Sequence, residues 1–299
     1  MTPFRTQNVP PPMSSYKLSF PEQVVHVNMS PSEDALAAIF RSGLVQVWDL
    51  GTRLPEAGKS RLRAGGKPAE PKLRWEQRMA PEGEFIAKQV CLAGNGEVAA
   101  LFWGNGVDGE VIRIANANEV WHEESLLACS QHVLWEKEAG WLIAERGGNI
   151  RAVDESKPGM VSICPRPQSV AISAESRIVF ALSDTGRLVA ASLIAGSDSC
   201  TLATGVTSFT ITPDFLIYTT SSQSSHYAPL SSVQRVLDGE DVALIPDEDW
   251  EQRRVERGAV AVVACPSSMS LVLQMPRGNL ETVYPRALVL SVVRRLVLA

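Results

Sequence analysis

The chain has 299 residues, of which 45% are hydrophobic and 20% charged, and it carries a formal net charge of −5. This composition is that of a globular protein with a core, and it excludes gross disorder. This net negative charge does not favour binding to nucleic acid or to a membrane surface, since both attract basic proteins.

The cysteines indicate a reducing compartment, and the apolar runs argue against a membrane span. The five cysteines are widely spread and never form a CxxC pair, so they predict small buried residues, neither disulfides nor zinc ligands. No N-terminal stretch has the order of a signal peptide, and no apolar run reaches the roughly 18 residues of a membrane span. We therefore expect a cytoplasmic protein without membrane contact, with the nucleus as a second compartment.

The chain opens with a Pro-rich, extended segment, residues 1–15, and then settles into a β-meander. The first meander covers residues 24–50 and consists of a strand VVHVNM, a turn, a strand ALAAIF, a second turn and a strand LVQVWDL. The first and last strands alternate, as half-buried strands do. The dipeptide Trp48–Asp49 at the end of the third strand is typical of propeller blades.

The same three-strand unit recurs through the chain. Further copies lie at residues 87–114, 132–154, 169–193, 206–230 and 258–275. The inner copies repeat every 35 to 44 residues, near the roughly 40–45 residues of a four-stranded blade. Each unit is apolar on both faces, so a single meander would expose apolar surface to water. Blades stacked face to face around an axis bury that surface.

These repeats predict an all-β fold, a WD-repeat-like β-propeller over residues 1–285. A two-sheet sandwich is the structural alternative, but it does not account for the regular period. Because the first unit begins so near residue 1, we expect an interior piece of a longer protein, whose ring need not close within these residues.

A basic insertion follows the first unit. Residues 51–80 hold eight Lys or Arg against three Glu, together with several Gly and Pro, and this predicts a mobile loop. A solvated, disordered insertion is the simpler interpretation. The alternative is an electrostatic patch for an acidic partner or an RNA backbone, formed by Arg61, Arg63, Lys67, Lys72 and Arg74.

Residues 238–251 are the opposite, with seven acidic side chains and no Lys or Arg. Arg253, Arg254 and Arg257 follow at once. The stretch lacks the Gly and the spacing of a calcium loop, so we expect an exposed acidic helix or loop that pairs with the arginines.

The search for catalytic, cofactor-binding and metal-ligating residues finds none. Residues 104–109 (GNGVDG) match GxGxxG formally, but an alternating strand follows them where a dinucleotide site needs a helix. The four histidines are scattered and form no HxxxH pair, and no GxSxG or Walker motif is present. An enzyme site in the central channel would need convergent carboxylates, histidines or metal ligands. We therefore predict a protein that is not an enzyme and carries no cofactor.

The end of the chain combines β and helical patterns. Residues 270–275 (SLVLQM) read as a buried strand, and Gly278 and Asn279 mark a turn because both tolerate positive φ. After Pro285, which suits the first position of a helix, an apolar stripe predicts a helix over residues 287–299. We expect residues 286–299 to begin a helical region.

The amino-acid identities in this C-terminal region are more specific than their pattern. The stretch MPRGNLETVYPRALVL at 275–290, with RRVERG at 253–258, CPSSMSLVL at 265–273 and VPPPM at 9–13, closely resembles the largest scaffold subunit of the Elongator complex, the IKAP family. The resemblance implies that the chain is the second of two β-propellers and ends in the first helix of an α-solenoid. The junction residues it implies are Met275, Pro276, Arg277, Gly278, Asn279, Leu280, Glu281, Tyr284, Pro285 and Arg286.

The resemblance also implies a function. Members of this family organise the complex that modifies wobble uridines of tRNA, while another subunit catalyses the chemistry. The implied partners are the other Elongator subunits, including the catalytic one, and tRNA only indirectly or weakly. We expect the solenoid and dimerisation regions of the family to lie outside this chain. The alternative is an unrelated WD-repeat adaptor that mediates protein–protein interactions.

Overall fold

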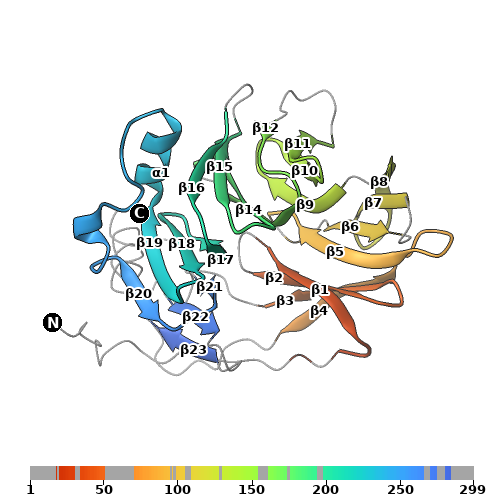
Figure 1. Ribbon diagram of the computed structural model, residues 1–299. Helices are drawn as coiled ribbons and strands as arrows, with labels where there is room; N and C mark the ends of the chain where they lie inside the picture. The colour runs from red at the N-terminus through yellow and green to blue at the C-terminus, as the bar shows by residue number, and fades with distance from the viewer. Residues whose placement is uncertain are drawn as a thin grey trace, which may run out of the picture.

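The computed structural model describes residues 18 and 20–283, except 31–33, 51–70, 95, 97–98, 105–108, 128–129, 154–160, 174–175, 194–197, 266–269 and 275–279. Within these residues the chain forms six antiparallel sheets, each built from consecutive strands (Figure 1). The prediction of an all-β propeller is confirmed, since each sheet is a meander centred on one of the predicted units.

The first three sheets have four strands each. Their strands are β1 (Val24–Met29), β2 (Ala35–Phe40), β3 (Leu44–Asp49) and β4 (Lys72–Arg78); β5 (Ile86–Leu92), β6 (Ala99–Gly104), β7 (Gly109–Ala115) and β8 (Val120–Leu127); and β9 (Ser130–Glu136), β10 (Gly140–Glu145), β11 (Asn149–Ala152) and β12 (Val161–Ser162).

The next two sheets also have four strands, and the sixth has three. Their strands are β13 (Pro167–Ser173), β14 (Ile178–Ser183), β15 (Leu188–Ser192) and β16 (Cys200–Ala203); β17 (Val206–Ile211), β18 (Phe215–Thr220), β19 (Ser224–Pro229) and β20 (Arg254–Arg257); and β21 (Ala261–Cys265), β22 (Ser270–Gln274) and β23 (Leu280–Val283). The helix α1 (Leu230–Leu237) and the 3₁₀ turn η1 (Asp247–Asp249) lie between β19 and β20.

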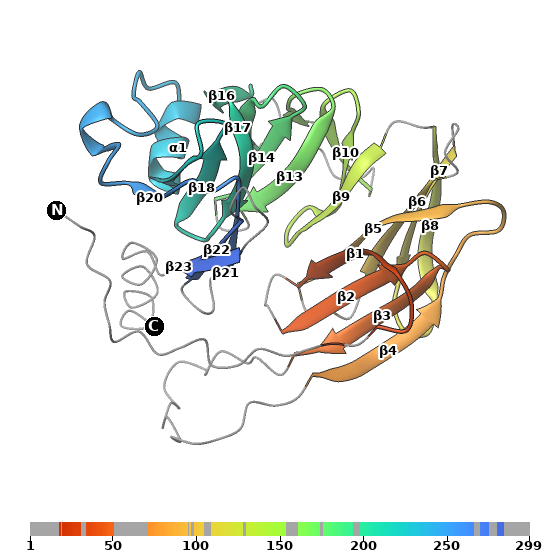
Figure 2. The ribbon, with the colours of Figure 1, turned by 60° about the horizontal axis from the view of Figure 1, so that its bottom comes forward.

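The sheets are arranged around an axis as blades. The first strand of each sheet packs beside the first strand of the next, in the order β1, β5, β9, β13, β17 and β21. No comparable contact joins β21–β23 to β1–β4 among the described strands. The first and sixth sheets are therefore the two ends of the series (Figure 2).

The core lies between the blades. Five apolar clusters each join two neighbouring sheets, from the first and second to the fifth and sixth. The second strands supply most of the fully buried side chains, and all six residues of β14 are buried. Their continuous apolar character follows from burial on both faces, and the radial stacking explains why single meanders lack a polar face.

Candidate interaction surfaces

The predicted junction falls largely outside the described residues. Residues 275–279 and 284–286 are not described, so the junction role of Met275, Pro276, Arg277, Gly278, Asn279, Tyr284, Pro285 and Arg286 stays a prediction, as does the helix over 287–299. Leu280 and Glu281 lie on β23, where they pair with Gln274 and Leu273 of β22. Residues 280–283 were assigned to no element from the sequence, and they form β23.

Only part of the predicted basic patch lies on residues that the structure describes. Arg61, Arg63 and Lys67 lie outside the described residues, whereas Lys72 and Arg74 lie on β4. The prediction of one loop over residues 51–80 is therefore wrong for residues 72–78. This segment alternates, and its central Trp75 is buried in the cluster between the first and second sheets. The Arg74 Nη2 atom lies 3.9 Å from Asp49 Oδ2 on the neighbouring strand.

A cavity of about 460 Å³ lies on the axis, lined by the first strands of the first four sheets. Its polar lining residues are His26, Asn28, Gln89, His132, Gln168 and Ser169, and it contains no Asp, Glu, Lys or Arg. Across the described residues, no three His, Cys, Asp or Glu side chains are grouped as metal ligands would be. The cavity wall offers hydrogen-bonding groups and apolar surface.

Polar side chains of the first strands join neighbouring sheets around the axis. Asn28 Oδ1 accepts a hydrogen bond from the Leu92 N–H at 2.9 Å, which links the first sheet to the second. Gln89 Oε1 accepts from the Val133 N–H at 2.9 Å, and Gln89 Nε2 donates to the Val133 carbonyl at 3.2 Å. His132 Nε2 lies 2.9 Å from the Pro167 carbonyl oxygen, so this nitrogen carries the proton in that contact.

The two hydrogen bonds between Gln89 and Val133 allow a direct test of this arrangement. We expect Gln89→Leu to lower the free energy of unfolding by about 1–3 kcal/mol, because it leaves the Val133 N–H and carbonyl without their partner. Gln168→Leu is the control, since Gln168 is exposed and also lies on an axial strand. Urea unfolding measures both. Equal effects of the two substitutions would contradict the role of Gln89.

Three histidines should make stability depend on pH. Burial lowers the pKa of His26, His132 and His226 below the ordinary value of 6.5, and the nearby charge of His132 lowers the pKa of His26 further. The unfolded chain therefore binds more protons than the folded chain as the pH falls below about 6.5. Stability is fully present above that pH and is lost below it.

We expect the urea midpoint to fall between pH 7.5 and pH 5.5, and His132→Gln to reduce that fall. The substitution removes one of the groups whose protonation the folded state disfavours. Urea titrations of both proteins at the two pH values measure the effect. An unchanged midpoint in the parent protein would show that these histidines do not control its acid stability.

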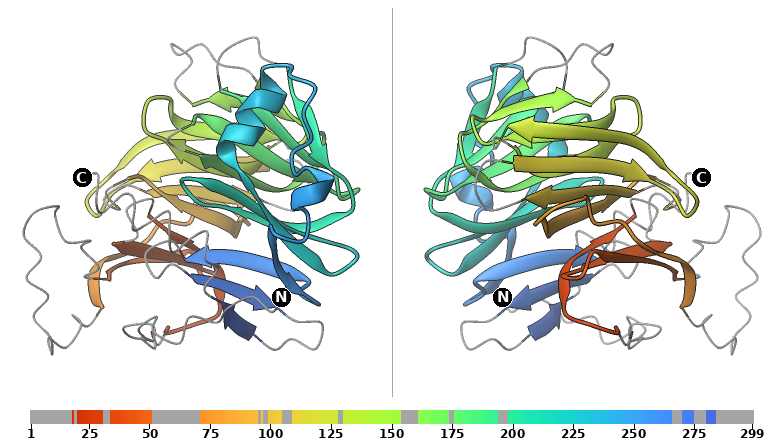
Figure 3. Two further views of the ribbon diagram at one scale, coloured as in Figure 1. Left: turned by 90° about the vertical axis from the view of Figure 1, so that its left-hand side faces the viewer. Right: turned by 90° about the vertical axis from the view of Figure 1, so that its right-hand side faces the viewer.

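An insertion between β19 and β20 packs against the fourth and fifth sheets. Leu230 and Val233 of α1 are buried there, and Figure 3 shows α1 on the outside of these sheets. Trp250 stacks on the buried His226, with ring centroids 3.6 Å apart. The predicted pairing of the acidic stretch with arginines is confirmed for Arg253 with Asp249 and for Arg254 with Glu251. The helix α1 was not predicted from the sequence; it begins directly after Pro229, the last residue of β19.

One face of the first sheet is apolar and exposed. On β1, His26 and Asn28 face the second sheet, whereas Val25, Val27 and Met29 on the opposite side are 40–48% exposed. Cross-strand pairs extend this surface as an apolar row over Met29, Leu36, Trp48 and Leu73. The second to fifth sheets each lie between two neighbours and bury such rows.

The chain matches the family described as "ELP1 N-terminal second beta-propeller" over residues 1–262. It is similar to Elongator complex protein 1 of Schizosaccharomyces pombe, with 28% identity over 298 residues, which cover 98% of this chain and 22% of the relative. The protein of the same name from Saccharomyces cerevisiae is 38% identical over 131 residues, covering 42% of this chain and 9% of the relative. The protein of the same name from Rattus norvegicus is 32% identical over 193 residues, covering 63% of this chain and 13% of the relative.

The chain thus spans about a fifth or less of the length of these curated relatives. Among solved structures it is similar to a chain in the crystal structure of a mitotic checkpoint complex, with a TM-score of 0.54 and 12% identity, covering 86% of this chain and 72% of that one. At this identity the likeness shows the fold alone.

Proposed function

Because the chain belongs to the family of the ELP1 second β-propeller, we propose that it is a non-catalytic scaffold part of the Elongator complex. The observation that carries the proposal is the family match over residues 1–262, supported by similarity to Elongator complex protein 1 in three species. Family membership argues against an unrelated WD-repeat adaptor. The partners in this proposal are the other Elongator subunits, including the catalytic one.

The geometry suits a scaffold. Five apolar clusters and the axial hydrogen bonds hold the blades in fixed positions. The loops that connect the strands, on either side of the propeller, therefore keep fixed distances from one another. A rigid frame lowers the entropic cost of binding, because its surfaces need not be ordered when a partner arrives. No described helix is long and apolar enough to cross a membrane.

We place the role of the protein in the modification of wobble uridines in tRNA, in the cytoplasm and also in the nucleus. The chain would contribute architecture, while another subunit catalyses the reaction. A net charge of −5 disfavours long-range attraction of tRNA, so contact with tRNA through this propeller would be weak or indirect.

The exposed face of the first sheet would be covered by a further sheet of the same propeller in the full-length protein. Two observations support this occupant. The apolar row has the composition of the faces that the other sheets bury, and the curated relatives extend well beyond the matched region. We expect Leu73→Cys in the full-length protein to react slowly with a thiol reagent, although Leu73 is 45% exposed here, whereas Val120→Cys reacts fast. Val120 is 41% exposed on the outer strand of the second sheet. Equal rates would exclude a covering sheet.

Complementation tests the proposed function. Cells that lack the endogenous subunit are supplied with the full-length protein or with a variant from which this propeller is deleted, and wobble-uridine modification is measured in bulk tRNA by mass spectrometry. We expect the intact protein to restore the modification and the deletion variant to fail. Full modification with the deletion variant would refute the proposal.

A further inference from the structure

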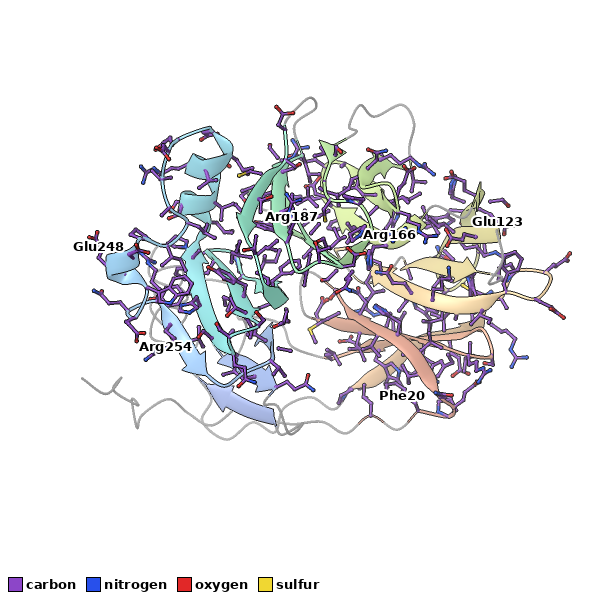
Figure 4. All side chains as sticks on the ribbon, viewed as in Figure 1. Phe20, Glu123, Arg166, Arg187, Glu248 and Arg254 are labelled. Carbon is purple, nitrogen blue, oxygen red and sulfur yellow. The ribbon has the colours of Figure 1, made fainter. Side chains whose placement is uncertain are left out.

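Three exposed arginines lie on neighbouring loops at one end of the propeller. Arg146 lies in the turn between β10 and β11, Arg166 in the connection between β12 and β13, and Arg187 just before β15. Turns between second and third strands and connections between sheets lie at the same end of a four-stranded meander, because the strands alternate in direction. Figure 4 labels Arg166 and Arg187 on the adjacent third and fourth sheets.

Backbone contacts hold these loops together. The Arg166 N–H donates to the Arg146 carbonyl at 2.9 Å, and the Ile163 N–H donates to the Gly148 carbonyl at 2.6 Å. Arg166 has a φ of 51°, which is uncommon for a residue other than glycine and is fixed here by its contact with the neighbouring turn. The positions of Arg146 and Arg166 are therefore set by the fold.

Arg187 belongs to the same group. The buried Cys164 lies in the same apolar cluster as Val189 of β15, which is two residues after Arg187, so the turn that carries Arg187 is adjacent to the connection between β12 and β13. Cys164 is two residues from Arg166 in the same connection. The Arg187 Nη2 atom donates to Thr201 Oγ1 at 2.7 Å, which anchors the side chain at one end.

The group has an excess of positive charge. Within the part of the chain that the structure describes, none of the three arginines forms an ion pair, whereas Arg113, Arg151, Arg177, Arg235, Arg253 and Arg254 do. Glu145, which precedes Arg146, pairs with Arg151, so Asp184 in the turn of Arg187 is the remaining carboxylate of these loops. With three guanidinium groups and one carboxylate, N–H donors remain for an anionic ligand. A guanidinium group binds a carboxylate through two parallel hydrogen bonds.

We infer that Arg146, Arg166 and Arg187 form a docking site for a short acidic polypeptide segment of a protein partner. The inference rests on the proposed scaffold function, since it assigns one of its contact surfaces.

Nucleic acid fits this site less well. Residues 146–148, 163–166 and 184–187 contain no aromatic side chain, so these loops lack the stacking platform that single strands use. Three cations would also neutralise only about three phosphates, so the electrostatic contribution to binding a nucleic-acid backbone would be small. The net charge of −5 repels a long polyanion more than a short acidic peptide.

The test compares two charge-reversal variants of the full-length protein. One carries Arg146→Glu, Arg166→Glu and Arg187→Glu. The control carries Arg41→Glu, Arg78→Glu and Arg235→Glu, three exposed positions elsewhere, so both variants change the net charge equally. The probes are a fluorescent ten-residue Glu–Ser peptide and a single-stranded RNA of matched charge, titrated at low salt.

We expect the first variant to lose at least about tenfold in peptide affinity, because three ion pairs are replaced by repulsion, and the control to lose much less. A similar loss in both variants, or none in the first, would refute the docking site. A larger loss for RNA than for the peptide would also refute it, in favour of a nucleic-acid surface. Copurification of other Elongator subunits with both variants is a separate readout. If these subunits copurify while peptide binding is unchanged, only the docking site is wrong.

Discussion

Replacing Trp103 by alanine should lower the free energy of unfolding by about 3–5 kcal/mol, the usual cost of removing a large buried aromatic side chain. Trp103 is 0% exposed and lies in the apolar cluster between the first and second sheets. The cavity it leaves is walled by two sheets that the axial strands hold in place, so collapse around it is restricted. Such a loss is a large part of the roughly 5–15 kcal/mol that stabilises a typical domain.

Trp121→Ala is the matched control. Trp121 is 53% exposed on β8, and its Nε1 donates to Glu119 Oε1 at the surface. We expect a change within about 0.5–1 kcal/mol, as for most surface positions. Urea unfolding followed by circular dichroism measures both variants. Comparable destabilisation by the two would mean that the stacking of the first two sheets is wrong.

Gly148→Val should be nearly as damaging, for a different reason. Gly148 has a φ of 95°, and a Cβ atom placed there would lie 2.8 Å from the Cys164 carbonyl carbon and 2.9 Å from its oxygen. A β-branched side chain disfavours this backbone conformation, and the contact is with backbone that cannot rotate away. We expect a loss of at least about 2 kcal/mol in the free energy of unfolding.

The adjacent glycine provides the control. A Cβ at Gly147 would meet no atom within 4 Å, so Gly147→Val should have a small effect. Thermal unfolding of the two variants distinguishes them. Because Gly148 positions the turn that carries Arg146 against the Arg166 loop, its replacement should also weaken binding of the acidic peptide probe. Indistinguishable melting curves for the two valine variants would refute the interlocked loops.

The sequence predicted the six units because alternation and apolar runs are strong where strands are buried. The apolar segment ALAAIF of the first predicted unit forms β2, and residues 178–182 of the unit 169–193 lie in β14; both strands are inside their sheets. The fourth strands were missed. They are short or polar, as in β12 (VS) and β16 (CTLA), because the outer edge of a blade faces water and the pattern is weak there. In β4 the basic residues concealed the alternation around Trp75.

The candidate surfaces depended more on the tertiary structure. Arg146, Arg166 and Arg187 are about 20 residues apart in sequence and come together only because the sheets stack. The apolar row likewise needs the cross-strand register of four strands before its members share one surface. The C-terminal motif, in contrast, indicated the family from the sequence alone, and the family match confirmed it.

Copurification tests the central claim most directly. The full-length protein is tagged and expressed in place of the endogenous subunit, with this propeller either intact or deleted, and the bound proteins are quantified by mass spectrometry. A scaffold role predicts that the other Elongator subunits are recovered with the intact protein and that at least one is lost when the propeller is removed. Recovery of every subunit at unchanged stoichiometry from the deletion variant would contradict it.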